Sequence, residues 1–598
     1  MAKKVQREHW SSSLGFVLAA TGSAVGLGNI WKFSYITGEN GGGAFVLIYL
    51  LSVALIGLPL LLCELAIGRN TQLSAVSAFD KLKPKVSLIA HIFGAIMVIN
   101  GISLCCFGQI GFGILSLLVG ALIFIEGWTI VGILATLVAF IIACYYTVVG
   151  GWTIFYTFQG FGGNLAATES TKDFFLNFIS IKDQMSITDS MTFAEQTNIL
   201  FHNILHHPVF YHFIFITLCS IVLCFGIKKG VERTVKFMMP LLFLILIFIA
   251  IRSVSLPGAM KGVKFLFATD FGKLKAESIV LAISHSFFTL SLGMGIMVAY
   301  GSYLPKTQNI FKSAIAIISL DTLVALLAGL AIFPALFSLG LKPGQGAGLA
   351  FITFPTVLSN IPGGTFWTGL FFFLLFVAAF TSQVSIMEVS ISFLIDKFNI
   401  KRIYSVIIIA VTVAIIGCFI AVSANDWQHL PTLEKMIKGA FSLDTTTKPF
   451  NNFLDLLNII VDTILLPVTG ILTAVFVGWV WGTKKGVDEI RHGSENFADV
   501  HLISFLAGLR DDKSHNSNVH VLTLASLWGI FIRFAIPVAI MIVIFDGIQK
   551  NLSSSEPSKE TSKAKVVDDK ALKQIQANIA KDSKNCPKLE KFELKTNK

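Results

Sequence analysis

Two apolar stretches of this sequence contain residues that interrupt helices, and these interruptions are where chemistry is expected. The first reads LAATGSAVGLGNIWKF and the second ISHSFFTLSLGMGIMVAY. Unwound backbone leaves carbonyls that can ligate a cation and helix N-termini that can hold a carboxylate. Because each bare backbone group costs several kcal/mol in lipid, such breaks are tolerated only where they line a polar cavity. The interrupting residues are Gly22, Gly26 and Gly28 in the first stretch and Ser291, Gly293 and Gly295 in the second.

Glycines in apolar helices also allow close helix packing, and for either stretch alone that explanation is as good as a binding site. The pair together favours a site. Glycine-interrupted spans at matching places in two halves of a chain are typical of secondary transporters, which bind their cargo near the middle of the membrane.

The elements that carry these breaks are expected to span a membrane. The 598-residue chain is 54% hydrophobic and 14% charged and contains 53 Phe, so a soluble domain of this size would lack the charge to cover its surface. The net charge of +11 falls in short loops between apolar runs, which argues against a nucleic-acid-binding face. Seven of the eight cysteines lie within apolar runs, and no disulfide framework is visible.

Apolar runs predict the individual spans, since a helix needs roughly 20 apolar residues to cross the hydrocarbon layer. Lys and Arg concentrate on alternate loops, beginning with Lys3, Lys4 and Arg7, which predicts a cytoplasmic N-terminus. The predicted spans are 14–36, 42–67, 128–160, 208–227, 234–254, 277–304, 309–338, 366–398, 402–424, 456–482 and 520–546.

One further apolar region is not accounted for by these spans. Between residues 86 and 146 the only charged side chain is Glu126, so this stretch is about three helices long where one would restore the alternation. We therefore expect an extra helical hairpin at about 87–126, turning near 107–111, for about thirteen spans in all. One long tilted helix with a re-entrant or interfacial segment is the alternative.

Several motifs, in this order and spacing, carry a family resemblance: REHW, GSAVGLGN, ENGGGAF, PLLLCELAIGR, KKGVER, FFTLSLGMG, GLAFITFP, AAFTSQ and LPVTGILTAVFVGW. Together they resemble the neurotransmitter:sodium symporters, in particular the bacterial amino-acid-carrying members, from Arg7 to about Ile548 apart from the hairpin. The resemblance implies an all-α polytopic protein of the bacterial inner membrane, with inverted five-helix repeats whose first and sixth helices are broken. It also implies import of a neutral, hydrophobic amino acid driven by sodium.

The resemblance divides the chain into segments of different role. The ranges are 1–13 for a cytoplasmic segment with the inner gate, 14–254 for the first repeat, 277–482 for the second repeat, 520–546 for the last transmembrane helix and 551–598 for a polar tail. The tail is rich in Lys, Ser, Asp and Glu without an apolar period, which predicts disorder.

Two sodium ions are expected beside the substrate, again by resemblance, and ligation by oxygen alone suits a hard cation. The first ion would be held by the carbonyls of Ala24 and Thr289 and the side chains of Asn29, Thr289 and Asp321. The second would be held by the carbonyls of Gly22, Val25 and Ala378 and the hydroxyls of Thr381 and Ser382. These two hydroxyls could instead bond back to their own helix.

The substrate carboxylate is expected at the backbone of Gly26 and Gly28 and at Tyr146, which alone would more often be a packing aromatic. Relatives that carry amines without a carboxylate have an aspartate at the position of Gly26, so its absence favours amino acids. The residues implied to line the side-chain pocket, which could equally be plain core, are Phe288, Ser291, Met294, Ile142 and Ile386.

Gates are implied at both ends of the pathway. The inner gate would consist of Arg7, Trp10, Tyr303 and Asp396. At the outer gate the family's usual Arg and Asp are replaced by Lys32 and Asn458, and a bridging Gln by His285, so closure is expected to rely on Phe288 and Tyr146. Asp455 or Asp462 is the alternative partner of Lys32.

Intramembrane carboxylates are candidates for function by default. Asp321 is expected to balance the charge of the ions, so that chloride is not required, although it could simply brace its helix. Glu64 matches a position that braces the first broken span, and Glu388 is open between helix bracing and proton coupling.

Other function classes find less support in the sequence. His202 and His206 have helical spacing for a metal, but no Cys or acidic residue completes a shell, which favours a solvated loop. We find no nucleophile or metal constellation of an intramembrane enzyme. A channel would not need a carboxylate site, and a non-transporting amino-acid sensor on the same fold is the alternative. The exact amino acid and the oligomeric state are not indicated.

Overall fold

The computed structural model describes residues 7–84, 88–106, 113, 116, 117, 120, 127–168, 170–181, 193–341, 348–424, 453–494, 497 and 523–553. Within these ranges the chain forms helices and turns, and β-structure is limited to isolated bridge residues, of which Gly42 and Thr269 pair with each other. The contacts divide the chain into a large unit, 1–551, and a short one, 552–598. Of the short unit only the end of a helix, Leu552 and Ser553, is described, so the predicted polar tail, 551–598, lies outside the described residues from 554 on.

Long apolar helices make up most of the large unit. Among the described residues, eight helices are long and apolar enough to cross a membrane, or up to ten if each of two bent pairs counts as one span. The eight consist of α3 (Gly43–Ser52), η2 (Val53–Gly57) and α4 (Leu58–Thr71); α8 (Thr129–Phe161); η3 (Ile227–Val231) and α13 (Glu232–Val254); α17 (Ile310–Ser338); α19 (Gly364–Phe398); α20 (Arg402–Val422); α22 (Phe453–Ile459), η6 (Ile460–Leu465), α23 (Leu466–Val475), η7 (Phe476–Gly482) and α24 (Thr483–Arg491); and α26 (Leu524–Ile530), η8 (Phe531–Ala535) and α27 (Ile536–Ser553).

The remaining helices are bent pairs, an interrupted helix, the apolar helix α6 and short connections. The bent pairs are α1 (Ser13–Ala24) with η1 (Gly28–Lys32) and α2 (Phe33–Glu39), and α11 (Phe193–Leu205) with α12 (Pro208–Cys224). The interrupted helix consists of α15 (Ala276–Thr289) and α16 (Ile296–Gly301). The apolar helix α6 is Leu88–Cys106. The connections are α5 (Ala75–Leu82), α9 (Asn164–Ala167), α10 (Thr171–Ile179), α14 (Met260–Phe267), η4 (Phe271–Lys273), η5 (Leu349–Thr353) and α18 (Phe354–Ser359).

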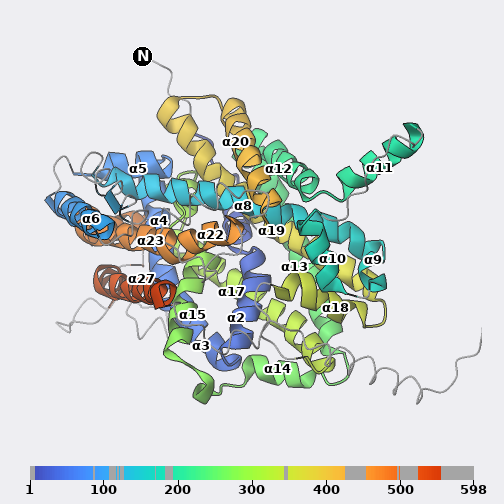
Figure 1. Ribbon diagram of the computed structural model, residues 1–598. Coiled ribbons are helices and arrows are strands. Elements are labelled where there is room, and N and C mark those ends of the chain that lie inside the picture. The colour runs from blue at the N-terminus through green and yellow to red at the C-terminus, as the bar shows by residue number, and fades with distance from the viewer. Residues whose placement is uncertain are drawn as a thin grey trace, which may run out of the picture. The chain divides into compact units, whose positions relative to one another are not determined.

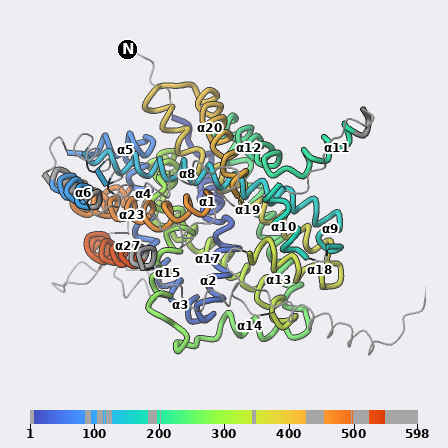
Figure 2. The backbone as a smooth tube through the Cα atoms, viewed as in Figure 1, coloured from blue at the N-terminus to red at the C-terminus, as the bar shows by residue number. Residues whose placement is uncertain are grey.

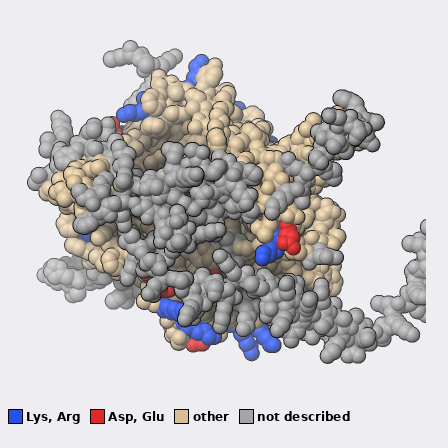
Figure 3. All heavy atoms as spheres, viewed as in Figure 1, with Lys and Arg blue, Asp and Glu red and all other residues tan. Residues whose placement is uncertain are grey.

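The predicted all-helical membrane architecture is confirmed. Each predicted span coincides with one of these helices, and the range 277–304 is α15 and α16. The two predicted breaks are both present, since α1 and α15 end where the glycine-rich stretches begin. Large apolar side chains on the outside suit lipid, as on α13, where Phe237 is 70% exposed and Leu244 66%. In Figure 3, atoms of Lys, Arg, Asp and Glu cover little of the described surface on this face.

The centre of the large unit is built around α8 and α19, which pack along each other (Figure 1). Their backbones meet at Gly160 and Gly369, because a Cβ built on Gly160 would lie 2.7 Å from the amide nitrogen of Gly369. Gln383 of α19 also donates to the carbonyl of Ala143 on α8, at 3.2 Å. Small residues at a crossing allow this close approach. Because α1 and α16 both pack against α19, this helix supports both breaks.

The apolar region before α8 contains α6 and the helical residues 113, 116, 117 and 120. A Cβ built on Gly101 would lie 2.8 Å from the carbonyl oxygen of Gly113, and one built on Gly120 would lie 3.0 Å from that of Gly94. Since later residues of α6 meet earlier residues of the second segment, the two run antiparallel. The expected turn at 107–111 and Glu126 lie outside the described residues, so the extra hairpin stays a prediction.

Candidate functional site

The first break lies between α1 and η1, in the interior of the large unit, where both halves pack against α17 (Figure 2). α1 begins at a capped N-terminus, where the Ser12 hydroxyl accepts from the Gly15 amide at 3.0 Å. It ends when Val25 takes an extended conformation, with ψ 95°. The helix axis then turns by 54°. The break therefore exposes the carbonyls of the last turn of α1 to α19.

The second break comprises residues 290–295 between α15 and α16. Ser291 has a φ of 53°, which few residues other than glycine adopt, and Gly293 and Gly295 have φ of 76° and 70°. The Ser291 hydroxyl donates to the carbonyl of Ser23 at 3.1 Å, which ties the second break to the first. A strained backbone that is held by such contacts is common at functional sites.

Three residues expected at the first sodium site lie together. The Asn29 amide nitrogen donates to Asp321 Oδ1 at 2.7 Å and to Thr289 Oγ1 at 2.9 Å, and Thr289 Oγ1 contacts both carboxylate oxygens at 3.1 Å. Tyr49 Oη donates to Asp321 Oδ2 at 3.4 Å. Asp321 is fully buried, and the ion pairs found among the described residues do not include it. Ala24 is buried directly before the break.

The groups expected at the second sodium site also gather at the first break. The Ser382 hydroxyl contacts the carbonyls of Gly22 at 3.2 Å and Val25 at 3.3 Å. The Thr381 hydroxyl contacts the carbonyl of Ala378 at 3.1 Å, within its own helix. Ser382 therefore reaches across to α1, whereas Thr381 makes the helix-internal bond that was the alternative for both. The acceptors recorded for the two hydroxyls among the described residues are backbone carbonyl oxygens, the ligand type that a hard cation requires.

Gly26 and Gly28 leave no room for a side chain. A Cβ on Gly26 would lie 2.7 Å from Ser382 Oγ and 2.8 Å from Tyr146 Oη, and one on Gly28 would lie 2.8 Å from the Phe288 ring. Tyr146 Oη accepts from the amide of Leu27 at 3.1 Å. The tyrosine hydroxyl is thus placed at the break, as its expected role requires.

Three apolar residues expected in the pocket are buried at or near the breaks. Ile142 and Ile386 are buried one helical turn from Tyr146 on α8 and from Ser382 on α19. Met294 is buried within the second break.

The residues expected at the inner gate form one cluster. Arg7 Nη1 pairs with both oxygens of Asp396, at 2.8 and 2.7 Å, and the guanidinium lies 4.6 Å from the centre of the Tyr303 ring. Trp10 Nε1 donates to the carbonyl of Tyr300 at 3.1 Å, and the two rings meet edge to face. The N-terminal segment is thereby fastened to the end of α16.

At the opposite end Lys32 forms its ion pair with Asp462, at 2.6 Å, and not with Asn458. Its ammonium also lies 4.1 Å from the centre of the Phe288 ring. The assignment of Asn458 is corrected, and of the two alternative carboxylates the structure selects Asp462. Asp462 sits in the π-helical turn η6, whose wider period shifts the following residues relative to a regular helix. A sequence alignment cannot detect that shift.

Two intramembrane carboxylates have definite partners. Glu64 Oε1 accepts from the amide of Gly293 at 2.7 Å, so it braces the second break. The expectation that it braces the first break was wrong. The second broken span passes beside α4, which the sequence does not reveal.

Glu388, which the sequence left open, accepts from Tyr303 Oη at 2.7 Å and pairs with Arg402 at 2.5 Å. These two contacts join Glu388 to Tyr303, one of the residues expected at the inner gate, and to the first residue of α20. The rings of His202 and His206 stack at 4.0 Å, and no group of three or more potential metal ligands occurs among the described residues.

The comparisons with known proteins decide the family. The family model described as "Sodium:neurotransmitter symporter family" matches residues 7–115 and 123–503. The chain belongs to this family. It is therefore a sodium-dependent symporter of multi-pass membrane type and not an enzyme, and the expected family is confirmed.

Individual relatives of this symporter are bacterial, archaeal and animal proteins. It is 32% identical over 542 residues to the "Uncharacterized sodium-dependent transporter YhdH" of Bacillus subtilis, which covers 90% of this chain and 97% of that protein. It is 26% identical to the "Sodium- and chloride-dependent GABA transporter 2" of Mus musculus, over 66% of this chain and 63% of that one. The crystal structure of MhsT in complex with L-phenylalanine matches with a TM-score of 0.66 and 33% identity, over 91% of this chain and 100% of that chain.

Some residues of the site gave no signal in the sequence. Tyr49 lies in an ordinary apolar run and Ser302 in a short loop, yet the first contacts Asp321 and the second accepts from Arg7 at 2.5 Å. Arg402, which pairs with Glu388, also belongs to none of the motifs that carry the resemblance. An intramembrane carboxylate such as Glu388 needs a cationic partner, so the first Arg of the following helix was the signal that could have indicated it.

Proposed function

We propose that this symporter imports a neutral, hydrophobic amino acid together with sodium, by alternating access. The observation that carries the proposal is the position of Asn29. Its amide nitrogen donates to Thr289 and Asp321, while its Oδ1 accepts from the amide of Gly26 at 3.2 Å. One side chain therefore connects the candidate ion site with the backbone expected to hold the substrate carboxylate.

This arrangement supplies a physical reason for coupling. A sodium ion beside Asp321 would draw the amide oxygen of Asn29 towards itself, because cations of this kind prefer oxygen ligands. The Gly26 amide would then lose its acceptor and become available to a carboxylate, whose oxygens could complete the ion's shell. Each ligand thus stabilises the conformation that the other needs, which is what coupled binding requires.

Two separate groups of oxygens support the proposal that two ions bind. We assign one sodium site to Ala24, Asn29, Thr289 and Asp321 and a second to Gly22, Val25, Ala378, Thr381 and Ser382. Asp321 supplies a fixed negative charge, so chloride is not required.

The residues proposed to line the pocket support a hydrophobic substrate. Ile142, Met294 and Ile386 are buried and apolar, and the residues assigned to the substrate are these with Gly26, Gly28, Tyr146, Phe288 and Ser291. The similarity to MhsT, whose structure contains L-phenylalanine, supports a hydrophobic amino acid.

The direction of transport rests on the proposed topology. The cytoplasmic end of the transport pathway, in a bacterial cell, is closed by the cluster of Arg7, Trp10, Tyr303 and Asp396. The outer end is closed by Lys32 with Asp462 and Phe288. This orientation follows the distribution of Lys and Arg between loops.

Uptake into proteoliposomes tests the function. The purified full-length protein should accumulate labelled phenylalanine above equilibrium when sodium is higher outside, and accumulation should stop when a sodium ionophore collapses the gradient. Unlabelled apolar amino acids should compete, whereas amines without a carboxylate should not. Sodium-dependent binding without accumulation would assign the protein as a sensor, and sodium flux without substrate would assign it as a channel.

A further inference from the structure

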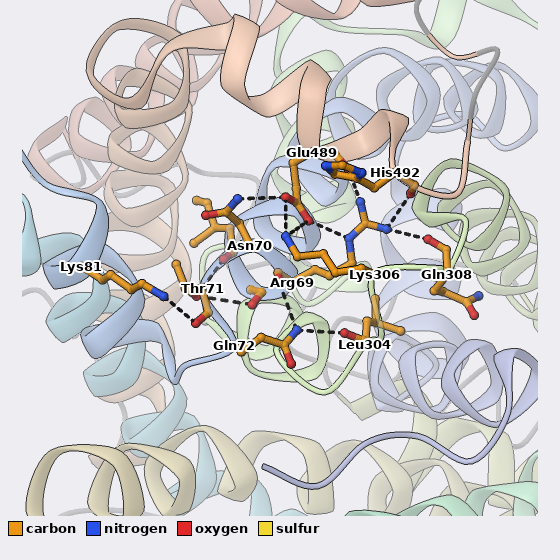
Figure 4. A network of polar contacts seen from close by, with 12 residues as sticks. Arg69, Asn70, Thr71, Gln72, Lys81, Leu304, Lys306, Gln308, Glu489 and His492 are labelled. Carbon is orange, nitrogen blue, oxygen red and sulfur yellow. Dashed lines mark hydrogen bonds and ion pairs between the residues drawn. The ribbon is translucent and has the colours of Figure 1, made fainter. Parts of the chain in front are cut away.

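A buried arginine lies at the end of α4, at the same end of the large unit as Arg7 and Asp396. The side chain of Arg69 is 0% exposed, and all its hydrogen-bond acceptors come from two distant segments (Figure 4). Its Nε donates to Glu489 Oε1 at 2.8 Å, and its Nη1 donates to the carbonyls of Gln308 at 2.6 Å and His492 at 2.9 Å. Its Nη2 donates to the carbonyl of Glu489. Such a rigid fork fixes the relative positions of the groups it bonds.

The partner Glu489 of α24 is equally well satisfied. Its side chain is 3% exposed and accepts from Asn70 at 2.8 Å and from Lys306 at 2.9 Å, in addition to Arg69. A buried carboxylate with three donors, two of them cationic, is stable where an unpaired one would not be. Beyond α24, Gly493 has a φ of 80°, and a Cβ there would lie 2.6 Å from the carbonyl oxygen of Thr307. Side-chain and backbone contacts therefore both join the end of α24 to the loop that contains Lys306 and Thr307.

That loop, Ser302–Asn309 between α16 and α17, is also the surface on which the N-terminal segment rests. Ser302 Oγ accepts from Arg7, the carbonyl of Tyr303 accepts from the amide of Trp10 at 3.2 Å, and Gln308 Nε2 donates to Ser13 Oγ at 2.6 Å. Loop 302–309 is therefore held on one side by Arg69 and Glu489 and carries the proposed inner gate on the other.

We propose that Arg69 and Glu489 are positioning residues for the inner gate, and that α24 sets how readily this gate opens. They hold loop 302–309 where the N-terminal segment closes on it. This inference rests on the proposed transport function, because a gate has meaning only for alternating access. The gate contacts stabilise the closed state only while loop 302–309 stays in position. Weakening the contacts that hold this loop therefore shifts the equilibrium towards the open state.

Variants of different residues in and near this network test different things. Arg69 is buried, so its replacement endangers folding. Lys306 is 52% exposed and joins loop 302–309 to Glu489 from the solvent side, so Lys306→Met cuts this link while the buried pair remains. Lys485 is exposed on α24, and the ion pairs found among the described residues do not include it, which makes Lys485→Met the matched control.

The test measures the position of α1 in the full-length protein. Spin labels on Leu14→Cys, at an exposed position of α1, and Lys401→Cys, at an exposed position before α20, in a background without native cysteines, report distances in nanodiscs without sodium. Lys306→Met should raise the ratio of open to closed distances by up to about fivefold, as expected for a partly exposed charged contact. Glu489→Gln should raise it further, and the double variant should resemble Glu489→Gln alone because both act through one contact.

Thermal unfolding separates gating from simple support. A purely structural role would lower the unfolding temperature of Lys306→Met and Glu489→Gln and leave the distance ratio at the value of Lys485→Met, and this result would overturn the inference. If Glu489→Gln does not fold, Lys306→Met alone decides. Failure of the proposed function has a different signature, since the wild type would then show no sodium-driven uptake whatever the distances do.

Discussion

Gly26 is the residue at which the candidate substrate site tolerates the least change. A Cβ built on Gly26 would lie within 3 Å of the hydroxyls of Ser382 on α19 and Tyr146 on α8, so a side chain at this position would displace one or both of them. The space that a methyl group would take is the space in which a carboxylate is proposed to bind.

We predict that Gly26→Ala reduces substrate affinity by roughly tenfold or more, since forcing an extra methyl group into a packed site costs about 1–3 kcal/mol. The measurement is equilibrium binding of labelled substrate at saturating sodium. Gly529→Ala is the matched control, because a Cβ there would lie 3.8 Å from Thr483 and fits without displacement. Equal affinities of the two variants would contradict the proposed carboxylate position.

Asn29 and Thr381 test the ion sites in the same way. Replacing either by Ala removes one oxygen ligand, which should raise the sodium concentration for half-maximal substrate binding by about tenfold, the equivalent of a charge-assisted contact. Thr412→Ala is the control for Thr381, because Thr412 also bonds back to its helix, to Ile408 at 2.8 Å, but lies exposed on α20. Unchanged sodium dependence in both site variants would refute the assignment.

The sequence predicted where the helices break better than it predicted which side chains form ion pairs. The two breaks were predictable because glycine and serine interrupt long apolar runs. The pairing of Lys32 with Asp462 was open, because η6 changes the facing of residues after Ile459. The contact between Arg69 and Glu489 was not predicted at all, since 420 residues separate the two and neither lies in a motif that names its partner.

At the level of elements, the helices followed the apolar runs closely, since a run of this length in a membrane has no alternative to a helix. The exception concerns α6. Its contacts with Gly113 and Gly120 agree with an antiparallel pair, and the family match leaves out residues 116–122 within the same region. A second membrane-spanning helix and a re-entrant segment would both produce such a pair, so topology must be measured directly.

A labelling experiment distinguishes the two topologies of this region. In a variant without Cys105 and Cys106, a cysteine introduced between Phe107 and Gly111 should react with an impermeant thiol reagent added outside the cell, because a hairpin with two spans places its turn there. A cysteine at Lys401, on the proposed cytoplasmic side, should react only after permeabilisation. Reaction of both positions from the cytoplasm alone would show that the hairpin does not cross the membrane.

For the whole molecule, the decisive quantity is the charge gathered at the two breaks. Two sodium ions and a zwitterion would meet in a space lined by neutral donors, where the one described carboxylate in contact with Asn29 and Thr289 is Asp321. At about 4 Å and an effective dielectric constant near 20, each unbalanced unit charge is worth about 4 kcal/mol before desolvation. A transporter of this kind therefore needs a fixed or a mobile anion.

We predict that the wild type transports equally well when chloride is replaced by gluconate, because Asp321 is proposed both to ligate the first sodium ion and to supply the balancing charge. Asp321→Asn keeps the size and the hydrogen-bonding contacts with Asn29 and Thr289 but removes the charge, so it should lose transport or become dependent on chloride. The comparison of initial uptake rates in the two anions, for both proteins, separates these roles. A wild type that stops in gluconate would refute the proposal, whereas an Asp321→Asn variant that transports normally in both anions would show that the carboxylate only braces α17. The described hydrogen-bond partners of the buried Asp321 carboxylate, Asn29, Thr289 and Tyr49, are all neutral, which is why the proposal places a cation beside it.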